Sequence, residues 1–309
     1  MTAPPVVCVL GPTASGKTAL ALELHGRGDV DLISVDSAMV YRGLDIGTAK
    51  PEPAVLAQHP HALVDIRDPE TVYSVADFVA DAHRLVAESR ALGRVPVLVG
   101  GTMLYFKRLF EGLAELPAAD AAVRAAIEDE AAREGWPALH AGLKRVDPDA
   151  ARRIAPHDQQ RIQRALEVYR LTGQPITTLQ RQSGGPDWPR IDVALVEPDR
   201  VDLHARIGDR FDAMMSAGFE NEVGTLLARP GVHRALPSLR AVGYRQVAAW
   251  LEGECSREQA VADAKTATRR LAKRQYTWLR SMAGLTFMSP HDPALLRRIS
   301  TQIDGFLSK

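Results

Sequence analysis

An eight-residue loop, GPTASGKT at residues 11 to 18, constrains the fold of this chain more than any other feature. It matches G-x-x-x-x-G-K-[ST], follows an apolar run at Val6 to Leu10 and precedes a helical stretch at Ala19 to Leu24. In that context the pattern predicts a P-loop, whose glycines let successive backbone N–H groups turn inward around phosphate. The residues predicted to bind a diphosphate are Gly11, Pro12, Thr13, Ala14, Ser15, Gly16, Lys17 and Thr18.

Two side chains of this loop carry its chemistry. Lys17 supplies a cation to the phosphates, and the Thr18 hydroxyl is the usual protein ligand of Mg²⁺ in such loops, so Mg²⁺ is the predicted cofactor. The N-terminus of the following helix adds its dipole. The chain is therefore predicted to be an enzyme that uses a di- or triphosphate. The loop alone does not say which one, although ATP is the first expectation.

Apolar runs and helical periodicity alternate through the first hundred residues. Further strands are predicted at Leu32–Val35, Ala62–Ile66 and Val95–Val99, with an amphipathic helix at Val75–Leu92 between the last two. Strands that alternate with helices indicate an α/β fold, in which a parallel P-loop NTPase-like sheet is flanked by helices.

A helical segment interrupts this α/β pattern. No convincing strand occurs from Ala118 to about Thr178, and the stretch is rich in Ala, Arg and Glu, with predicted helix starts at Asp147 and Asp158. A Gly- and Pro-rich loop at 182–189 precedes a predicted returning strand at 191–196, and another is predicted at 285–288. We therefore predict a core at 1–115, an all-helical insertion at 116–186 and a second core segment at 187–309.

Composition excludes several classes of protein. Lys plus Arg and Asp plus Glu are both 38, so the formal net charge is zero and gives no sign of a nucleic-acid partner. The two cysteines, Cys8 and Cys255, fit no disulfide scaffold or metal motif. The longest early apolar run, Val6 to Leu10, is too short for a signal peptide or a membrane span. A cytoplasmic protein without membrane association is expected.

Polar residues follow two of the predicted strands. Asp36 comes directly after the strand that ends at Val35, and Gly100-Gly101-Thr102 follows the strand at 95–99. Ligands of open parallel sheets bind beyond the carboxyl ends of the strands, so both segments are expected near the P-loop. A carboxylate there can hold Mg²⁺ through water or act as a base, although Asp36 could also be an ordinary cap or turn residue.

A second cluster of functional interest is basic. Six cations and no acid lie between residues 265 and 280, and helical spacing gathers them on one face: Lys265, Arg269, Arg270, Lys273, Arg274 and Arg280. Leu271, Trp278 and Leu279 are expected to face the core. Such a stripe in a neutral protein is typical of a nucleic-acid contact or, equally, of a solvated helix face.

Long motifs in order along the chain resemble one family. They are GPTASGKT at 11–18, LISVDSAMVYRGLDIGTAKP at 32–51, DIRDPETVYSVADF at 65–78, VLVGGTMLYFKRLFEGL at 97–113, HDQQRIQRALEVYRLTGQP at 157–175, LRAVGYRQ at 239–246 and TRRLAKRQYTWLR at 268–280. The chain closely resembles the tRNA dimethylallyltransferases from the P-loop to about Leu285. It lacks a C-terminal Cys/His pair and so looks like the short bacterial form.

This resemblance implies a reaction and a set of site residues. Family members transfer a dimethylallyl group from its diphosphate to N6 of adenosine 37, beside the anticodon of tRNA, and are generally monomeric. By resemblance, the P-loop binds the diphosphate of that donor, Asp36 is the general base and Thr102 lies near the reacting centre. The segments that match tRNA contacts are Asp36, Ser37, Ala38, Met39, Thr102, Arg124, Gln160, Arg161, Ile162, Gln163, Arg164, Arg240, Ala241, Val242, Gly243, Tyr244 and Arg245.

The chemistry of that reaction matches these residue types. An exocyclic adenine amine is a poor nucleophile that must lose a proton as it attacks carbon, and a nearby carboxylate can take that proton. The departing diphosphate gains charge, which N–H donors, Lys17 and Mg²⁺ can stabilise. The base must also leave its stack to reach the site. The residues that face the apolar allyl group cannot be assigned from the sequence.

Two other functions fit part of the sequence. A small-molecule kinase would bind ATP in the P-loop and could use the helical insertion as a lid. An RNA-binding NTPase-like switch would bind tRNA without changing it. The long match at residues 32–51 favours the transferase over both.

Overall fold

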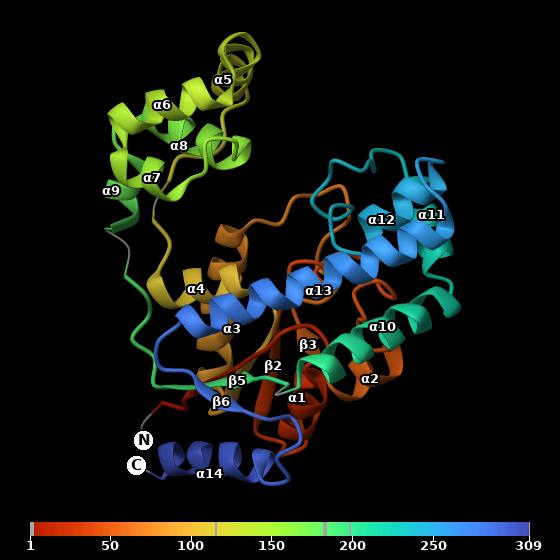
Figure 1. Ribbon diagram of the computed structural model, residues 1–309. Coiled ribbons are helices and arrows are strands. Elements are labelled where there is room, and N and C mark those ends of the chain that lie inside the picture. The colour runs from red at the N-terminus through yellow and green to blue at the C-terminus, as the bar shows by residue number, and fades with distance from the viewer. Residues whose placement is uncertain (1–2, 115, 182–183, 198, 309) are drawn as a thin grey trace. The chain divides into compact units, whose positions relative to one another are not determined.

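The computed structural model describes residues 3–114, 116–181, 184–197 and 199–308, which form two compact units (Figure 1). One unit joins Met1–Lys107 to Asp187–Lys309, and the other is Arg108–Pro186. The second unit begins before residue 116, where the composition shift placed the boundary. Its first and last segments lie against each other: a Cβ added to Gly185 would come 1.7 Å from the Phe110 carbonyl oxygen.

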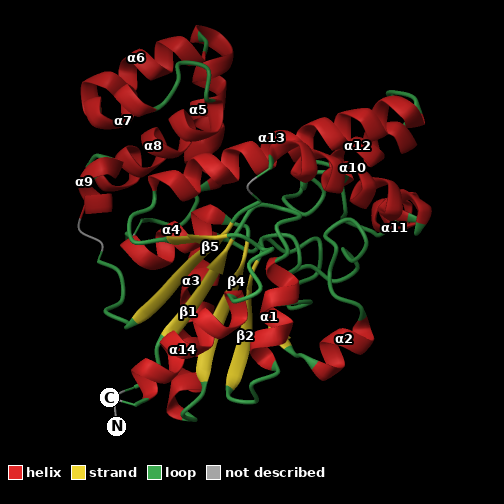
Figure 2. Cartoon of the chain, turned by 60° about the horizontal axis from the view of Figure 1, so that its bottom comes forward, coloured by secondary structure: helices red, strands yellow, loops and turns green. Residues whose placement is uncertain are grey.

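A six-stranded sheet forms the centre of the first unit, with the order β3-β2-β4-β1-β5-β6 and parallel pairing throughout (Figure 2). This confirms the predicted parallel α/β fold. The strands are β1 (Val6–Leu10), β2 (Val30–Val35), β3 (His61–Ala62), β4 (Val95–Gly100), β5 (Arg190–Leu195) and β6 (Thr286–Met288).

One predicted strand is much shorter than expected. The prediction placed it at Ala62–Ile66, whereas β3 ends at Ala62. Leu63 and Asp65 adopt positive φ angles of 67° and 56°, which a β-strand does not contain. Apolar composition predicted extended chain here, but these two residues turn the backbone out of the sheet.

Burial explains why these runs form strands. Every residue of β1 is fully buried, as expected for a central strand covered on both faces. Leu20 and Leu24 of α1 and Ile299 and Ile303 of α14 pack with one face of the sheet in a single apolar cluster. The helices of this part of the chain are α1 (Lys17–His25), α2 (Pro53–Gln58), α3 (Val75–Ala91), α4 (Met103–Glu111), α10 (Arg200–Ser216), α11 (Phe219–Leu227), α12 (Tyr244–Leu251), α13 (Arg257–Ser281) and α14 (Leu295–Leu307).

The described residues of the second unit form helices and no strand. Asp147 and Asp158 cap α7 and α8, as predicted, because their carboxylates accept backbone N–H groups of the first turn. Ile127, Leu143 and Ile162 lie in an apolar cluster of their own. The helices are α5 (Ala121–Glu134), α6 (Trp136–Val146), α7 (Pro148–Arg153), α8 (Gln159–Thr172) and α9 (Ile176–Arg181).

The order of the strands positions the candidate site. β4 lies between β2 and β1, so the loops that follow these three parallel strands emerge side by side. Asp36 follows β2, Gly101 and Thr102 follow β4, and the P-loop follows β1. In the part of the chain that the structure describes, no helix is both long and apolar enough to cross a membrane.

Candidate active site

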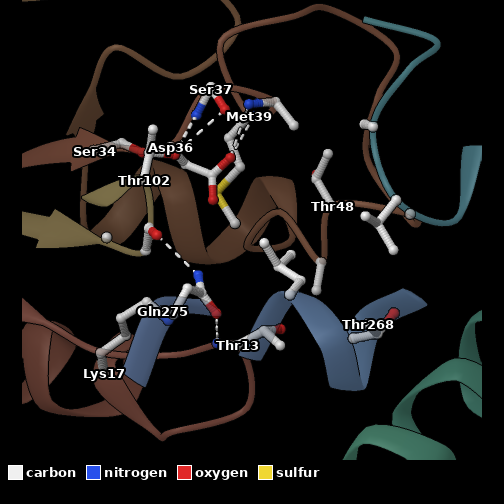
Figure 3. Close-up of a pocket in the computed structure, with 18 of the residues that line it drawn as sticks. Thr13, Lys17, Ser34, Asp36, Ser37, Met39, Thr48, Thr102, Thr268 and Gln275 are labelled. Atoms are coloured by element: carbon white, nitrogen blue, oxygen red, sulfur yellow. Dashed lines mark hydrogen bonds between the residues drawn. The ribbon is translucent and has the colours of Figure 1, made fainter. Parts of the chain in front are cut away.

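A cavity of about 610 Å³ opens at the carboxyl ends of these strands. Three of the loops that line it are predicted from sequence, through Lys17, Asp36 and Thr102. Figure 3 shows their side chains in one close-up, in which Lys17 lies beside α13 and Asp36 lies on the side away from that helix. The structure therefore brings the predicted phosphate loop, base and Gly-Gly-Thr segment into one site.

The backbone of the P-loop is wound into positive φ angles. Gly16, the residue before α1, has φ 83°, and Ala14 has φ 62°, which is strained for a residue with a Cβ. Ala14 is held there by packing against Leu203 and Ile207 of α10. This winding places the free N–H groups of the first turn of α1 at the cavity, where an anion can accept them.

Besides Ala14 and Gly16, the predicted phosphate-binding residues fall into two sets. Thr13, Lys17 and Thr18 line the cavity, whereas Gly11, Pro12 and Ser15 are buried behind it. The buried Ser15 hydroxyl oxygen has no hydrogen-bond partner among the described residues.

Lys17 is the principal cation of the loop. Its Nζ donates to the Pro12 carbonyl at 2.8 Å, which holds the side chain folded over the loop. Burial lowers its pKa to about 8, an effect that Asp36 partly offsets and Arg210 reinforces. The lysine is therefore poised to gain from an arriving anion, because a negative ligand favours its charged form.

This lowered pKa predicts a pH-dependent affinity for diphosphate. Above about pH 8 the free protein must take up a proton at Lys17 to bind, so affinity for inorganic diphosphate should fall by up to about tenfold per pH unit. Calorimetric titration between pH 6.5 and 9.5 measures this slope. Lys17→Arg stays charged throughout that range and is the control, since ionisation of the ligand affects both proteins equally. Parallel profiles for the two proteins would contradict the prediction.

Asp36 lies at the end of β2 in a tight turn. Its Oδ1 accepts the backbone N–H groups of Ala38 and Met39 at 2.8 and 3.2 Å. No described residue donates a hydrogen bond to its other oxygen, Oδ2, and the side chain lines the cavity. One oxygen thus orients the carboxylate while the other is left for a ligand.

Thr102 joins this turn to the loop after β4. Its Oγ1 accepts the backbone N–H of Ser37 at 3.0 Å and donates to the Ser37 hydroxyl at 3.3 Å (Figure 3). These contacts fix the residue that directly follows Asp36. Thr102 therefore holds the carboxylate turn in place and lies at the cavity surface itself.

Arg210 is a site residue that the sequence analysis missed. It projects from α10 into the cavity, and its one hydrogen bond within the described residues is a long one, 3.4 Å, from Nη2 to the Thr48 carbonyl. Burial lowers its pKa, and Asp36 partly compensates. A cation buried without a paired carboxylate is costly unless a ligand supplies the negative charge. Its helical spacing with Ile207 and Met214, which also line the cavity, was the available sequence signal.

The cavity also has an apolar wall. It is lined by large apolar side chains from α4, α10 and α13, namely Met103, Leu104, Ile207, Phe211, Met214, Leu271 and Trp278. Leu271 and Trp278 were predicted to face the core, and this was wrong: α13 presents them to the cavity, whereas Leu279 is fully buried as predicted. A cavity with cations at one end and an apolar wall suits an amphiphilic ligand.

The predicted tRNA-contacting residues of the first unit lie mostly at this cavity. Ser37, Ala38 and Met39 line it, as do Arg240, Ala241, Val242 and Tyr244. Arg245 is exposed, whereas Gly243 is buried with φ 95° before α12. Tyr244 is fully buried, and its hydroxyl donates to Glu222 at 2.5 Å. Glu222 also accepts backbone N–H groups of residues 45–47, so this bond fixes Tyr244 beside the loop at 45–51.

The predicted contacts in the second unit differ from one another in exposure. Gln160 and Arg161 are exposed, and the one ion pair that Arg161 forms with a described residue is with Asp158, at 3.3 Å. The side chain of Ile162 is fully buried, so it packs the core of the unit and offers RNA no surface. Gln163 donates to Glu128 at 2.7 Å.

Arg124 and Arg164 share one buried carboxylate. Their guanidinium groups donate to Glu167 at 2.8 and 2.6 Å, and Glu167 also accepts the Asp120 N–H. Burial alone would raise the pKa of Glu167, but these hydrogen bonds outweigh it and lower the pKa. Arg124 thus joins α5 to α8, whereas Arg164 lies on α8 with Glu167 and reaches the Pro117 carbonyl ahead of α5 at 2.8 Å; each keeps a partly exposed face.

The basic stripe on α13 is largely free of acidic partners. Lys265 pairs with Asp212 at 2.7 Å. No ion pair is found within the described residues for the other five cations, Arg269, Arg270, Lys273, Arg274 and Arg280, all of which are exposed. Arg274 also lines the cavity. The stripe thus presents positive charge beside the site.

Comparison with known proteins agrees with this geometry. The IPP transferase family model matches residues 39–282. The tRNA dimethylallyltransferase of Cupriavidus necator is 56% identical over 291 residues, which cover 91% of this chain and 89% of that protein. The tRNA dimethylallyltransferase 2 of Hahella chejuensis is 50% identical over 308 residues, which cover 95% and 93%.

Solved structures show the same fold. The full-length tRNA isopentenylpyrophosphate transferase of Bacillus halodurans has a TM-score of 0.72 and 35% identity, and the match covers 99% of this chain and 97% of that one. A eukaryotic dimethylallyltransferase, solved while acting on tRNA, has a TM-score of 0.83 at 23% identity over 98% and 80%. The family model and these relatives confirm the resemblance found in the motifs, and the chain belongs to the IPP transferase family.

Proposed function

We propose that this protein transfers a dimethylallyl group from dimethylallyl diphosphate to N6 of adenosine 37 in the anticodon loop of tRNA, acting as a cytoplasmic monomer. One observation carries the proposal: a carboxylate with a free oxygen, Asp36, shares a single cavity with the P-loop lysine and an apolar wall. A kinase site needs the phosphate loop but not an apolar wall of this size beside it.

The carboxylate performs the proton transfer. As the N6–carbon bond forms and the carbon–oxygen bond to diphosphate breaks, the amine must lose one proton. Asp36 Oδ2 accepts that proton, while Oδ1 stays fixed by the N–H groups of Ala38 and Met39. The carbon–oxygen electron pair leaves with diphosphate, so the step is balanced without an oxidant or a second cofactor.

The P-loop receives the leaving group. Lys17, Arg210 and the N–H groups at the start of α1 are all positioned to stabilise the charge that develops on diphosphate. The apolar wall holds the five-carbon chain away from water and excludes water from the reacting carbon. Leu104, Phe211 and Trp278 are its largest members from the three helices.

Mg²⁺ fits the oxygen ligands at this site. The Thr18 hydroxyl lines the cavity and is a hard oxygen donor of the kind that Mg²⁺ prefers, and Asp36 would contact the ion only through water, which leaves its Oδ2 available as the base. No group of three acidic, histidine or cysteine side chains suited to a metal occurs among the described residues, which suits an ion held mainly by water and diphosphate oxygens. Bound there, Mg²⁺ would neutralise part of the diphosphate charge.

The RNA partner is recognised by both units. Extruding a base from a loop costs about a few kcal/mol, which phosphate contacts elsewhere must supply. Arg240 and Arg274 at the cavity rim and the exposed Arg161 of the second unit are suited to this role. The stripe on α13 adds sequence-independent attraction.

The function is tested by incubating undermodified tRNA with dimethylallyl diphosphate, Mg²⁺ and the purified protein, followed by nucleoside mass spectrometry. Isopentenyl adenosine at position 37 is the expected product, with one diphosphate released for each. A parallel reaction with ATP distinguishes the transferase from a small-molecule kinase. ATP consumption without modified adenosine would overturn the transferase, and tRNA binding with neither activity would favour an RNA-binding switch.

A further inference from the structure

Gln275 is a nearly buried polar residue at a core position of α13. It lies three residues after the buried Ala272 and four before the buried Leu279, and only 7% of it is exposed. A polar side chain at that spacing needs hydrogen-bond partners, since burying an unsatisfied amide costs about 1–3 kcal/mol. The partners of this side chain are two of the loops that form the site.

Each end of the Gln275 amide bonds to a different loop. Its Oε1 accepts the backbone N–H of Thr13 in the P-loop at 3.0 Å, and its Nε2 donates to the Gly101 carbonyl at 2.8 Å (Figure 3). The loops approach closely at this point: a Cβ added to Gly101 would come 2.7 Å from Nε2 and 3.3 Å from the Gly11 carbonyl oxygen. The amide therefore spans the narrow space between the ends of β1 and β4.

These bonds extend to the proposed base. Gly101 directly precedes Thr102, whose Oγ1 accepts the N–H of Ser37, the residue after Asp36. We propose that Gln275 is a positioning residue: it fixes the phosphate loop relative to the Thr102 loop, and so the leaving group relative to Asp36. This inference rests on the proposed transferase function, because only transfer between two substrates requires that alignment.

The chemistry of the side chain explains why glutamine suits this place. Among side chains of this length at neutral pH, only the amide offers one donor and one acceptor at the same end. Lys17 Nζ also lies near Gly101, 3.7 Å from the site of a Cβ there. A carboxylate at position 275 would lack the donor for the Gly101 carbonyl and would compete with diphosphate for the charge of Lys17.

The test compares Gln275→Glu and Gln275→Met with the wild-type protein in single-turnover transfer at saturating substrates. A small displacement of reacting groups costs about 10²-fold in rate, so Gln275→Met should transfer about 10- to 100-fold more slowly at every pH, with tRNA affinity unchanged. Gln275→Glu should be equally slow at pH 8. Its rate relative to wild type should rise as the pH falls, because a protonated carboxyl regains a donor for the Gly101 carbonyl.

The matched control is Gln259→Glu, the same change at an exposed position of α13. It should follow the wild-type pH profile. A wild-type rate in Gln275→Met, or a Gln275→Glu profile parallel to wild type, would overturn the positioning role. If Gln275→Met melts below the assay temperature, the positioning role is judged from the pH response of Gln275→Glu alone. Absence of transfer by every protein, wild type included, would instead overturn the proposed function and the inference with it.

Discussion

Replacing Asp36 with asparagine is expected to reduce the rate of dimethylallyl transfer by about 10²- to 10⁴-fold, the usual contribution of a general base. Asparagine keeps the turn, because its side-chain oxygen can still accept the N–H groups of Ala38 and Met39. It cannot take a proton from the adenine amine. The loss should therefore fall on the chemical step, while tRNA affinity stays nearly unchanged.

The measurement is a single-turnover rate with saturating tRNA, beside a fluorescence-anisotropy titration of tRNA. Asp36 raises the pKa of Lys17, so its removal would leave the lysine less charged near pH 8. An assay at pH 6.5 keeps Lys17 protonated in both proteins and isolates the base. Asp36→Ala also removes the turn acceptor, and comparing the two variants separates proton transfer from geometry. Turnover by the asparagine variant at the wild-type rate would exclude Asp36 as the base.

The parts of the fold and site that sequence predicted are those written in contiguous residues. The P-loop, the strand before it and the acid after β2 each occupy one short segment, and parallel strands bring their ends to one edge of a sheet. A helix cap is also local, because the capping side chain bonds the backbone of the turn that directly follows it. The caps at Asp147 and Asp158 were therefore predictable. The third strand was not, because positive φ at Leu63 and Asp65 has no signal in apolar composition.

The rest of the site depends on which helices cover the sheet ends. Periodicity shows that α10 and α13 each have an apolar face, but it does not distinguish a face packed on the core from one that lines a cavity. Leu271 and Trp278 were misplaced for that reason. Arg210 and Gln275 reach the site from helices far along the chain, and only tertiary structure brings them to the P-loop.

Arg210→Gln should slow transfer by about 10²- to 10³-fold, the cost of losing one preorganised group that stabilises developing charge. It should also raise the melting temperature of the ligand-free protein. The guanidinium is half-buried beside Lys17 with no carboxylate ion pair among the described residues, and removing it relieves an unfavourable desolvation of charge.

Arg206, four residues earlier on α10, is the matched control. Its guanidinium forms an ion pair with the buried carboxylate of Glu197, and it does not line the cavity. Arg206→Gln should therefore lower the melting temperature, because the buried Glu197 carboxylate loses its arginine and keeps only His291 and the Asp199 N–H among the described residues, and should leave the single-turnover rate within a few-fold of wild type. The two substitutions should thus change the melting temperature in opposite directions, and only Arg210→Gln should slow the single-turnover rate strongly.

Scanning calorimetry and single-turnover transfer on the same preparations measure both quantities. A fall in melting temperature for Arg210→Gln would mean that the guanidinium stabilises the ligand-free fold, with the Thr48 carbonyl as its contact, and would contradict the predicted relief of charge burial. With inorganic diphosphate present, the wild-type protein should gain more thermal stability than Arg210→Gln, since only the wild type can pair this cation with the ligand. Equal gains would remove Arg210 from the diphosphate site, because its buried charge would then have no anion to stabilise.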